Sequence, residues 1–330
     1  MLDVRRREFI AALGGAAALA FAALPCWPRA LHAQQQPIKI IFPFAAGGSG
    51  DALSRLIGNS LHTALSQPVI VENRTGAAGR LGVAAVKNAA PDGGTLLITP
   101  IAPMAVYQHV YKDLEYDPIN DFVALSQLAT FDFAVAAGSQ VAAGSLKELV
   151  AWVKADTARA VFGSPAAGAL PHFFGISFGR AAGLELRHVA YRGSAAALAD
   201  LVAGHVPMVF TTISDLVELH KAGRVRILAT SGAGRSPFMP EVPTFREAGF
   251  DLQGTSWFGA FAPAKTPPAV VDRYSKIMAA AVRATEVRER LLGFGLQPTG
   301  TSAAEFAAIQ KADAALWAPA VKASGFTPQQ

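Results

Sequence analysis

Cysteine and charge are scarce in this sequence. Cys26 is the only cysteine among 330 residues, and charged side chains make up 16 % of the chain. Because Cys26 lies in an N-terminal segment that we expect to be removed, the mature protein is expected to have no disulfide, thiolate metal site or cysteine nucleophile. The six histidines beyond residue 33 lack metal-ligand spacing, so we expect neither a metal nor a cofactor.

Several enzyme signatures are also missing. The chain has no Gly-Lys-Ser/Thr phosphate loop, and no dinucleotide fingerprint follows its first predicted strand. The run Gly47-Gly48-Ser49-Gly50-Asp51 is not a nucleophile elbow, because Asp51 stands where a second glycine is needed. Lys and Arg number 29 against 24 Asp and Glu, with no basic stripe, so nucleic-acid binding is not indicated.

The N-terminus has the pattern of an export signal. Arginines at positions 5–7 precede fifteen uncharged residues, 10–24, and the small residue Ala33 ends the segment. This pattern predicts a secretory signal over residues 1–33 and a periplasmic location. The run Arg6-Arg7-Glu8-Phe9-Ile10 resembles a twin-arginine signal, and a plain Sec signal fits as well. No later run reaches the roughly 20 apolar residues of a membrane span, so no stable membrane insertion is expected.

Strand, glycine-rich loop and helix recur along the rest of the chain. Residues 38–42 form a short apolar run, followed by a glycine-rich loop and by leucines at helical spacing. The same succession recurs at residues 69–90 and begins a second series near residue 161. Ligands of such sheets bind at the carboxyl ends of the strands. We therefore predict an α/β protein of two lobes, each a doubly wound sheet, with a ligand cleft between them.

The two series of units set the predicted lobe boundaries. Lobe 1 is predicted at residues 34–132 plus 253–330, and lobe 2 at residues 133–252. Residues 133–136 indicate a strand at the first crossing, and the chain is expected to return near Gly254. The loops that follow the strands are rich in Gly, Ala, Ser and Thr and nearly free of charge. They favour backbone hydrogen bonding over proton chemistry.

The glycine-rich loop at residues 43–51 is a candidate anion site. A helix that starts after Gly50 presents unpaired N–H groups and the positive end of its dipole, which stabilise an anion without any lysine. Asp51 either caps this helix or contacts the ligand, directly or through water, and both roles can coexist.

Four further features allow two interpretations each. The segment 75–79 is either a flexible turn or part of the cleft. His172 either packs locally or lines the cleft. Arg192 either pairs with a surface carboxylate or offers its guanidinium fork to a ligand carboxylate. Trp257 and Phe258 either belong to the core or form a platform for the ligand.

A series of segments, in order, resembles the motifs of one family. Pro-Phe-Ala-Ala-Gly-Gly-Ser-Gly-Asp at 43–51 resembles the Pro-Phe-x-x-Gly-Gly-x-x-Asp loop of the Bug family, the periplasmic substrate receptors of tripartite tricarboxylate transporters. Val-Glu-Asn-Arg-Thr-Gly-Ala-Ala-Gly at 71–79 and Ala-Pro-Asp-Gly-Gly-Thr-Leu-Leu at 90–97 are similar to further family segments. The match continues through Tyr191-Arg192-Gly193-Ser194 to Ser256-Trp257-Phe258-Gly259 and beyond.

The resemblance implies a type II-like periplasmic binding protein that closes on a small carboxylate and has no catalytic activity. In such a TctC-like receptor, loops of both lobes hold the carboxylate largely through backbone groups and ordered water. The candidate ligand-binding residues are Phe44, Gly47, Gly48, Ser49, Asp51, Thr75, Gly76, Ala77, Thr99, Pro100, Ser164, Ala167, Gly168, His172, Arg192, Gly193, Thr211 and Thr212.

Departures from the family pattern bear on ligand choice. Hydroxyl side chains that are frequent in the family near Ala169 and Pro171 are missing, and Thr211-Thr212 stands where members often have Asp-Asn. Loss of that carboxylate predicts a neutral distal end of the pocket. A ligand with an ammonium group would then be disfavoured, because nothing offsets its buried charge.

The predicted function is a solute receptor whose partners are a small carboxylate and the membrane permease subunits of a tripartite tricarboxylate-type transporter. A receptor that docks on a sensor protein uses the same closure, and the sequence does not separate the two. An exported α/β hydrolase is a third alternative, but no Ser, His and Asp are grouped by position.

Overall fold

Ten strands form one hydrogen-bonded sheet in residues 36–327, the part of the chain that the computed structural model describes, and eight of them follow one another in a continuous path. Their order is β2-β1-β3-β9-β4-β7-β5-β6, and β8 and β10 also pair with β4. The predicted export signal lies outside the described residues. The strands are β1 (Ile38–Phe42), β2 (Val69–Asn73), β3 (Thr95–Pro100), β4 (Phe122–Gly138), β5 (Val161–Ser164), β6 (Arg187–Ala190), β7 (Met208–Thr212), β8 (Val225–Thr230), β9 (Thr255–Pro263) and β10 (Gln297–Pro298).

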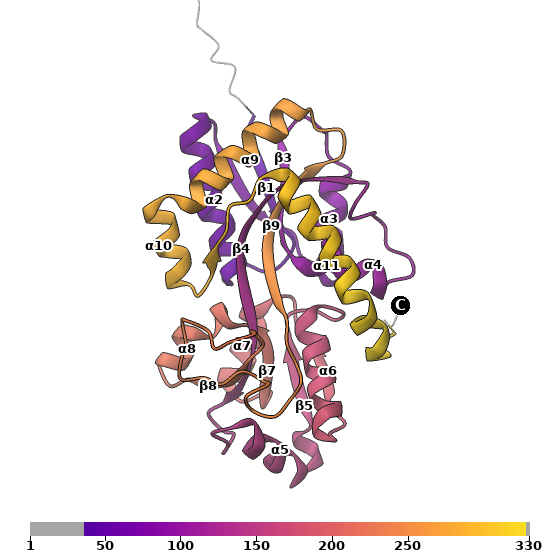
Figure 1. Ribbon diagram of the computed structural model, residues 1–330, viewed down its shortest axis with the longest axis vertical. Helices are drawn as coiled ribbons and strands as arrows, with labels where there is room; N and C mark the ends of the chain where they lie inside the picture. The colour runs from indigo at the N-terminus through magenta and orange to yellow at the C-terminus, as the bar shows by residue number, and fades with distance from the viewer. Residues whose placement is uncertain (1–35, 328–330) are drawn as a thin grey trace, which may run out of the picture. The chain divides into compact units, whose positions relative to one another are not determined.

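Helices alternate with the strands along the chain, as expected for an α/β protein (Figure 1). Short 3-10 segments are η1 (Ala77–Gly79), η3 (Thr157–Arg159) and η4 (Ile213–Asp215), and η2 (Ala102–Val106) is a π-helical turn. The α-helices are α2 (Ser49–Leu65), α3 (Arg80–Lys87), α4 (Tyr107–Val110), α5 (Leu146–Lys154), α6 (Leu170–Ala182), α7 (Ser194–Ala203), α8 (Val217–Lys221), α9 (Pro268–Arg283), α10 (Thr285–Gly293) and α11 (Ala303–Ser324).

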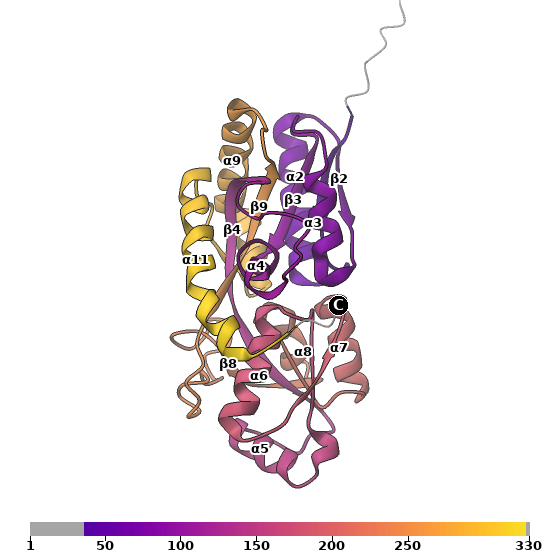
Figure 2. The ribbon, with the colours of Figure 1, turned by 90° about the vertical axis from the view of Figure 1, so that its right-hand side faces the viewer.

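Strand β4 is shared by two groups of strands, and the path is continuous for this reason. From Phe122 to Asp132 it pairs antiparallel with β9, beside β1, β2 and β3. From Phe133 onward it pairs with β7 and β8, in the group that also contains β5 and β6. Figures 1 and 2 show β4 passing from one half of the fold into the other. This is the two-lobed α/β arrangement expected from the sequence; the lobe boundaries at 132/133 and 252/253 stay a prediction.

Two apolar layers cover the second half of β4. Because neighbouring residues of a strand point to opposite faces, Val135 and Ala137 join the larger core cluster, whereas Ala134 and Ala136 join a second cluster. The second cluster includes Leu201 of α7. The strand is therefore buried on both sides, which explains its continuous apolar sequence.

The first half is built around the parallel strands β1, β2 and β3. Helix α2 turns Leu53, Ile57 and Leu61 inward, and all three side chains are fully buried. It packs against β1, β2 and α9, and α9 in turn packs against β4 (Figure 2). The glycine-rich loop between β1 and α2 is thus anchored at both of its ends.

The sequence indicated a strand only from residue 133, whereas β4 begins at Phe122. Ser126 and Gln127 interrupt the apolar pattern of its first half, yet both are buried. The Ser126 hydroxyl donates to the carbonyl of Thr301, and the backbone N–H of Gln127 donates to the Thr301 hydroxyl. Thr301, 174 residues from Gln127, therefore pairs the Ser126 hydroxyl and the Gln127 backbone N–H, and the local sequence pattern contains no sign of this partner.

No helix in residues 36–327 has the length and apolar character needed to cross a membrane.

Replacing Gln310 should destabilise the fold, because this buried side chain of α11 donates hydrogen bonds to the carbonyls of Met104 and Pro118. Gln310→Met leaves both carbonyls without this donor and is expected to lower the free energy of unfolding by about 1–3 kcal/mol. Urea unfolding with an unchanged m-value measures the loss. Lys311→Met places the same side chain on the exposed face of α11 and should change stability by less than about 0.5 kcal/mol. Equal stability of the two variants would contradict this role of Gln310.

Candidate ligand-binding site

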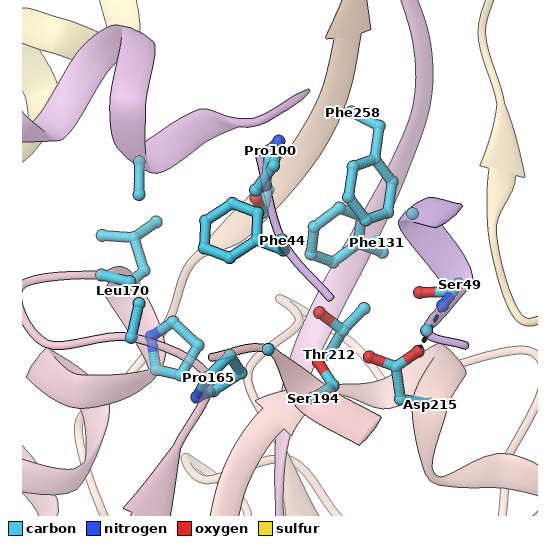
Figure 3. Close-up of a pocket in the computed structure, with 18 of the residues that line it drawn as sticks. Phe44, Ser49, Pro100, Phe131, Pro165, Leu170, Ser194, Thr212, Asp215 and Phe258 are labelled. Atoms are coloured by element: carbon cyan, nitrogen blue, oxygen red, sulfur yellow. Dashed lines mark hydrogen bonds between the residues drawn. The ribbon is translucent and has the colours of Figure 1, made fainter. Parts of the chain in front are cut away.

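A cavity of about 70 Å³ is lined by loops and strands from both halves of the fold (Figure 3). Its walls are mainly apolar, and Asp215 is the only ionisable side chain among the described residues that line it. The lining residues are Phe42, Phe44, Ala45, Gly48, Ser49, Gly50, Pro100, Ile101, Ala102, Phe131, Phe133, Pro165, Ala166, Ala169, Leu170, Pro171, Gly193, Ser194, Thr212, Asp215, Ser256 and Phe258.

Aromatic side chains from β1, β4 and β9 form one wall of the cavity. Phe131 and Phe133 are two residues apart on β4 and therefore face the same side, with ring centroids 5.6 Å apart. Phe131 also lies 4.6 Å from Phe258 of β9. Ser256, which is paired with Phe131 in the sheet, lines the cavity beside these rings. Its hydroxyl is buried and has no hydrogen-bond partner within residues 36–327.

Three helices begin at the cavity without a side-chain cap. The N-cap residues are Gly48 for α2, Ala169 for α6 and Gly193 for α7, and none of them makes a side-chain capping bond. The first N–H groups of a helix have no partner within the helix. Together with the helix dipoles, these exposed amides favour an anion in the cavity.

Asp215 of η4 lies at the start of α2. Its Oδ1 accepts a hydrogen bond of 2.7 Å from the Ser49 amide, shown as a dashed line in Figure 3. Burial raises the pKa of Asp215, and hydrogen bonds from Ser194 and Ser49 offset only part of this effect. The expectation from the sequence considered Thr211 and Thr212 but missed this carboxylate, which lies at the helix start and three residues beyond Thr212; the neutral distal end stays a prediction. The position of Asp215 after the carboxyl end of β7 was a usable signal.

The structure brings six of the eighteen predicted site residues together around the cavity: Phe44, Gly48, Ser49, Pro100, Gly193 and Thr212. The remaining twelve are not among the lining residues, although several hold the lining loops in place. These twelve are Gly47, Asp51, Thr75, Gly76, Ala77, Thr99, Ser164, Ala167, Gly168, His172, Arg192 and Thr211. Direct ligand contact by any of the eighteen stays a prediction.

Asp51 stabilises the glycine-rich loop without lining the cavity. Its carboxylate accepts hydrogen bonds from the Gly47 amide, the Arg55 guanidinium and the Asn73 side-chain amide, at 2.9–3.1 Å. Burial alone would raise the pKa of Asp51, but the bonds from Arg55, Asn73 and Gly47 outweigh it and hold the pKa below its ordinary value. These bonds are local and hold the loop, but none of them caps a first-turn amide of α2, and ligand contact by Asp51 stays a prediction.

Two stacked histidines support the loop between β5 and α6. The rings of His172 and His188 lie 3.8 Å apart. His172 Nδ1 accepts a hydrogen bond of 3.0 Å from the Gly168 amide, and His188 Nε2 lies 2.7 Å from the Ser164 hydroxyl. Burial lowers the pKa of His172 to about 4, and burial together with the neighbouring His172 lowers that of His188 to about 3. Both rings are therefore neutral at physiological pH, and His172 packs locally.

Three other predicted residues, which do not line the cavity, have local structural roles. The Thr211 hydroxyl donates to Ser194 at 2.9 Å, which orients a cavity residue. The side chain of Arg192 is exposed and forms no ion pair in the part of the chain that the structure describes, but its carbonyl accepts a 3.0 Å bond from the Ala45 amide. Gly76 has φ +130° at the turn before η1, a conformation that favours glycine.

The sequence did not place eight of the lining residues in a candidate binding loop, and for Phe258 it allowed two interpretations. The eight residues are Phe42, Ile101, Ala102, Phe131, Phe133, Asp215, Ser256 and Phe258. The two interpretations of Trp257 and Phe258 are resolved by the alternation of β9. Phe258 lines the cavity, whereas Trp257 faces away, donates to Asp313 at 2.7 Å and packs on Phe306.

No group of histidine, cysteine, aspartate and glutamate side chains suited to a metal ion occurs among residues 36–327.

A two-lobed α/β fold with a cavity between its halves is the architecture of periplasmic binding proteins. Residues 53–326 match the family model described as "Tripartite tricarboxylate transporter family receptor", TctC. The chain belongs to this family, as its resemblance to Bug receptors indicated. Because the family consists of substrate-binding receptors, the expectation of a binding protein rather than an enzyme is confirmed.

Relatives and solved structures agree with this assignment. A Cupriavidus necator protein described as "UPF0065 protein in gbd 5'region" is 32 % identical over 308 residues, which are 92 % of this chain and 93 % of that protein. The R. palustris protein Rpa4515, solved with adipate, has a TM-score of 0.85 and 28 % identity, covering 92 % of this chain and 100 % of its own. MatC of Rhodopseudomonas palustris, solved with malate, has a TM-score of 0.81 and 28 % identity, covering 86 % and 98 %.

The histidine pair should make stability fall with acidification. The folded protein keeps both rings neutral down to about pH 4, whereas unfolded histidine binds a proton below its ordinary pKa of 6.5. The free energy of unfolding is therefore greatest above about pH 6.5, and each histidine lowers it by up to about 1.4 kcal/mol per pH unit as the pH falls toward 4.

Urea unfolding of the wild type and of His188→Gln between pH 7 and pH 4.5 measures this effect. The wild type should lose more stability over the interval than the variant. His62→Gln, at an exposed position on α2, should follow the wild type. Parallel curves for wild type and His188→Gln would contradict the assignment.

Proposed function

We propose that this receptor captures a small carboxylate between its two lobes and delivers it to the membrane permease subunits of a tripartite tricarboxylate-type transporter. The observation that carries the proposal is the convergence of the uncapped starts of α2, α6 and α7 on one cavity. The adipate and malate bound by two related proteins of known structure support a carboxylate as the ligand class.

The cavity offers different surroundings to the two ends of such a ligand. The amides of Gly48 and Gly50 make no hydrogen bond within the described residues and are available to a carboxylate. The phenylalanine wall suits an apolar chain, whose burial stabilises the complex by about 25 cal/mol per Å². The unpartnered hydroxyl of Ser256 would gain its missing hydrogen bond from a polar group farther along the ligand.

Closure of the lobes around the ligand completes the site. The halves touch through the Ala45 amide and Arg192 carbonyl, through Ser214 and Ser49, and through the Tyr111 hydroxyl and Ala167 carbonyl. A ligand that contacts both halves stabilises this closed arrangement relative to an open one. The permease subunits would then recognise the closed form.

The same proposal places the receptor in the periplasm after removal of residues 1–33. The arginine-led apolar run at the N-terminus motivates this step. N-terminal sequencing of the protein from a periplasmic extract should begin near Gln34. A periplasmic protein that still begins at Met1 would contradict cleavage.

Gly48→Val should weaken carboxylate binding about tenfold or more, which corresponds to about 1.4 kcal/mol. Gly48 has an extended backbone, φ −90° and ψ 171°, so valine fits without backbone strain, but its side chain enters the space beside the α2 amides. Calorimetric titration of the mature protein with adipate and malate measures the affinity. Gly234→Val, at a glycine with open space around it, serves as the matched control and should bind as the wild type does. Unchanged affinity in a folded Gly48→Val protein would overturn the placement of the carboxylate.

A further inference from the structure

Asp215 places a negative charge at the point where the proposed carboxylate would bind. Its carboxylate takes the first amide of α2, and a Cβ built on Gly48 would lie only 3.6 Å from Oδ1. The free amides of Gly48 and Gly50 flank the amide that Asp215 occupies. A ligand carboxylate on these amides therefore lies beside the Asp215 carboxylate.

Neutral donors hold Asp215 in this position. Asp215 accepts from the Ser49 amide, and the hydroxyl groups of Ser194 and Ser49 also interact with it and lower its pKa. Ser194 itself accepts from Thr211, and Ser49 accepts from Ser214. No ion pair of Asp215 occurs within the described part of the chain, and no basic side chain lines the cavity there. The network fixes the geometry of the carboxylate but leaves its charge without a counter-ion.

We propose that Asp215 is the specificity-determining residue of this site and selects a carboxylate that carries a positively charged amine on the adjacent carbon. Two carboxylates in an enclosed, largely apolar cavity repel each other strongly, since little solvent screens them. An ammonium group between them forms an ion pair with Asp215 while the ligand carboxylate keeps the helix amides. This inference rests on the proposed carboxylate capture and reverses the preference expected from Thr211-Thr212.

Matched pairs of ligands test the inference on the wild-type protein. Calorimetry at pH 7.5 compares succinate with aspartate and adipate with 2-aminoadipate. The inference requires the amino compound of at least one pair to bind about tenfold tighter than its partner, which is 1.4 kcal/mol. Tighter binding of both plain diacids overturns the role of Asp215 but leaves carboxylate capture standing. Failure of all four compounds to bind overturns both proposals.

Asp215→Asn keeps the shape of the side chain and removes its charge. This variant should bind the amino compound about tenfold more weakly or worse, and should bind the plain diacid as tightly as the wild type or tighter. The preference for the amino compound is then lost. Glu218→Gln removes an exposed carboxylate three residues away on α8 and should keep the wild-type preference. If Asp215→Asn instead tightened the binding of the amino compound and of the plain diacid equally, Asp215 would merely compete with the ligand for the Ser49 amide. That result would overturn the proposed selection of amino compounds. The wild-type comparison decides the question even if Asp215→Asn does not fold.

Discussion

The exchange of pairing partners along β4 is the constraint on which the site depends. One strand pairs with β9 up to Asp132 and with β7 and β8 from Phe133, so two groups of strands share a single backbone. At this crossing, strand alternation turns Phe131 and Phe133 toward the same side. The loops of both halves then meet over these rings, and the cavity forms between them.

The polar chemistry of the cavity comes from helix starts that lack caps. Gly48, Ala169 and Gly193 have no side chain able to satisfy a first-turn amide, and a capping residue would stabilise the helix by about 1 kcal/mol at Ala169 and by only a few tenths of that at the two glycines. The uncapped N–H groups are less stabilising for the helices, but they stay available as hydrogen-bond donors at the cavity. Within residues 36–327, the first amide of α2 is the only first-turn amide of these three helices with an acceptor from another part of the protein, and that acceptor is Asp215. The proposed charge selection and the proposed anion binding thus involve the same helix terminus.

Residues behind the cavity keep these donors in place. Asp51, Arg55 and Asn73 hold the loop before α2, and the stack of His172 on His188 holds the loop before α6. A binding loop on rigid supports loses little conformational entropy when the ligand arrives, which favours affinity. Several residues that the sequence offered as ligand contacts belong to this supporting layer.

The sequence by itself determined the succession of strands, glycine-rich loops and helices, and with it Gly193 at a helix start and the loop 43–51 before another, although α2 begins at Ser49 rather than after Gly50. These signals are local, because the start of a helix depends on residues within one turn. Tertiary structure alone decided the strand Phe122–Asp132, the inward face of β9 and the position of Asp215. Ser49 and Asp215 are 166 residues apart in the chain. These two residues are hydrogen-bonded because β4 pairs with strands of both halves and so holds the halves together.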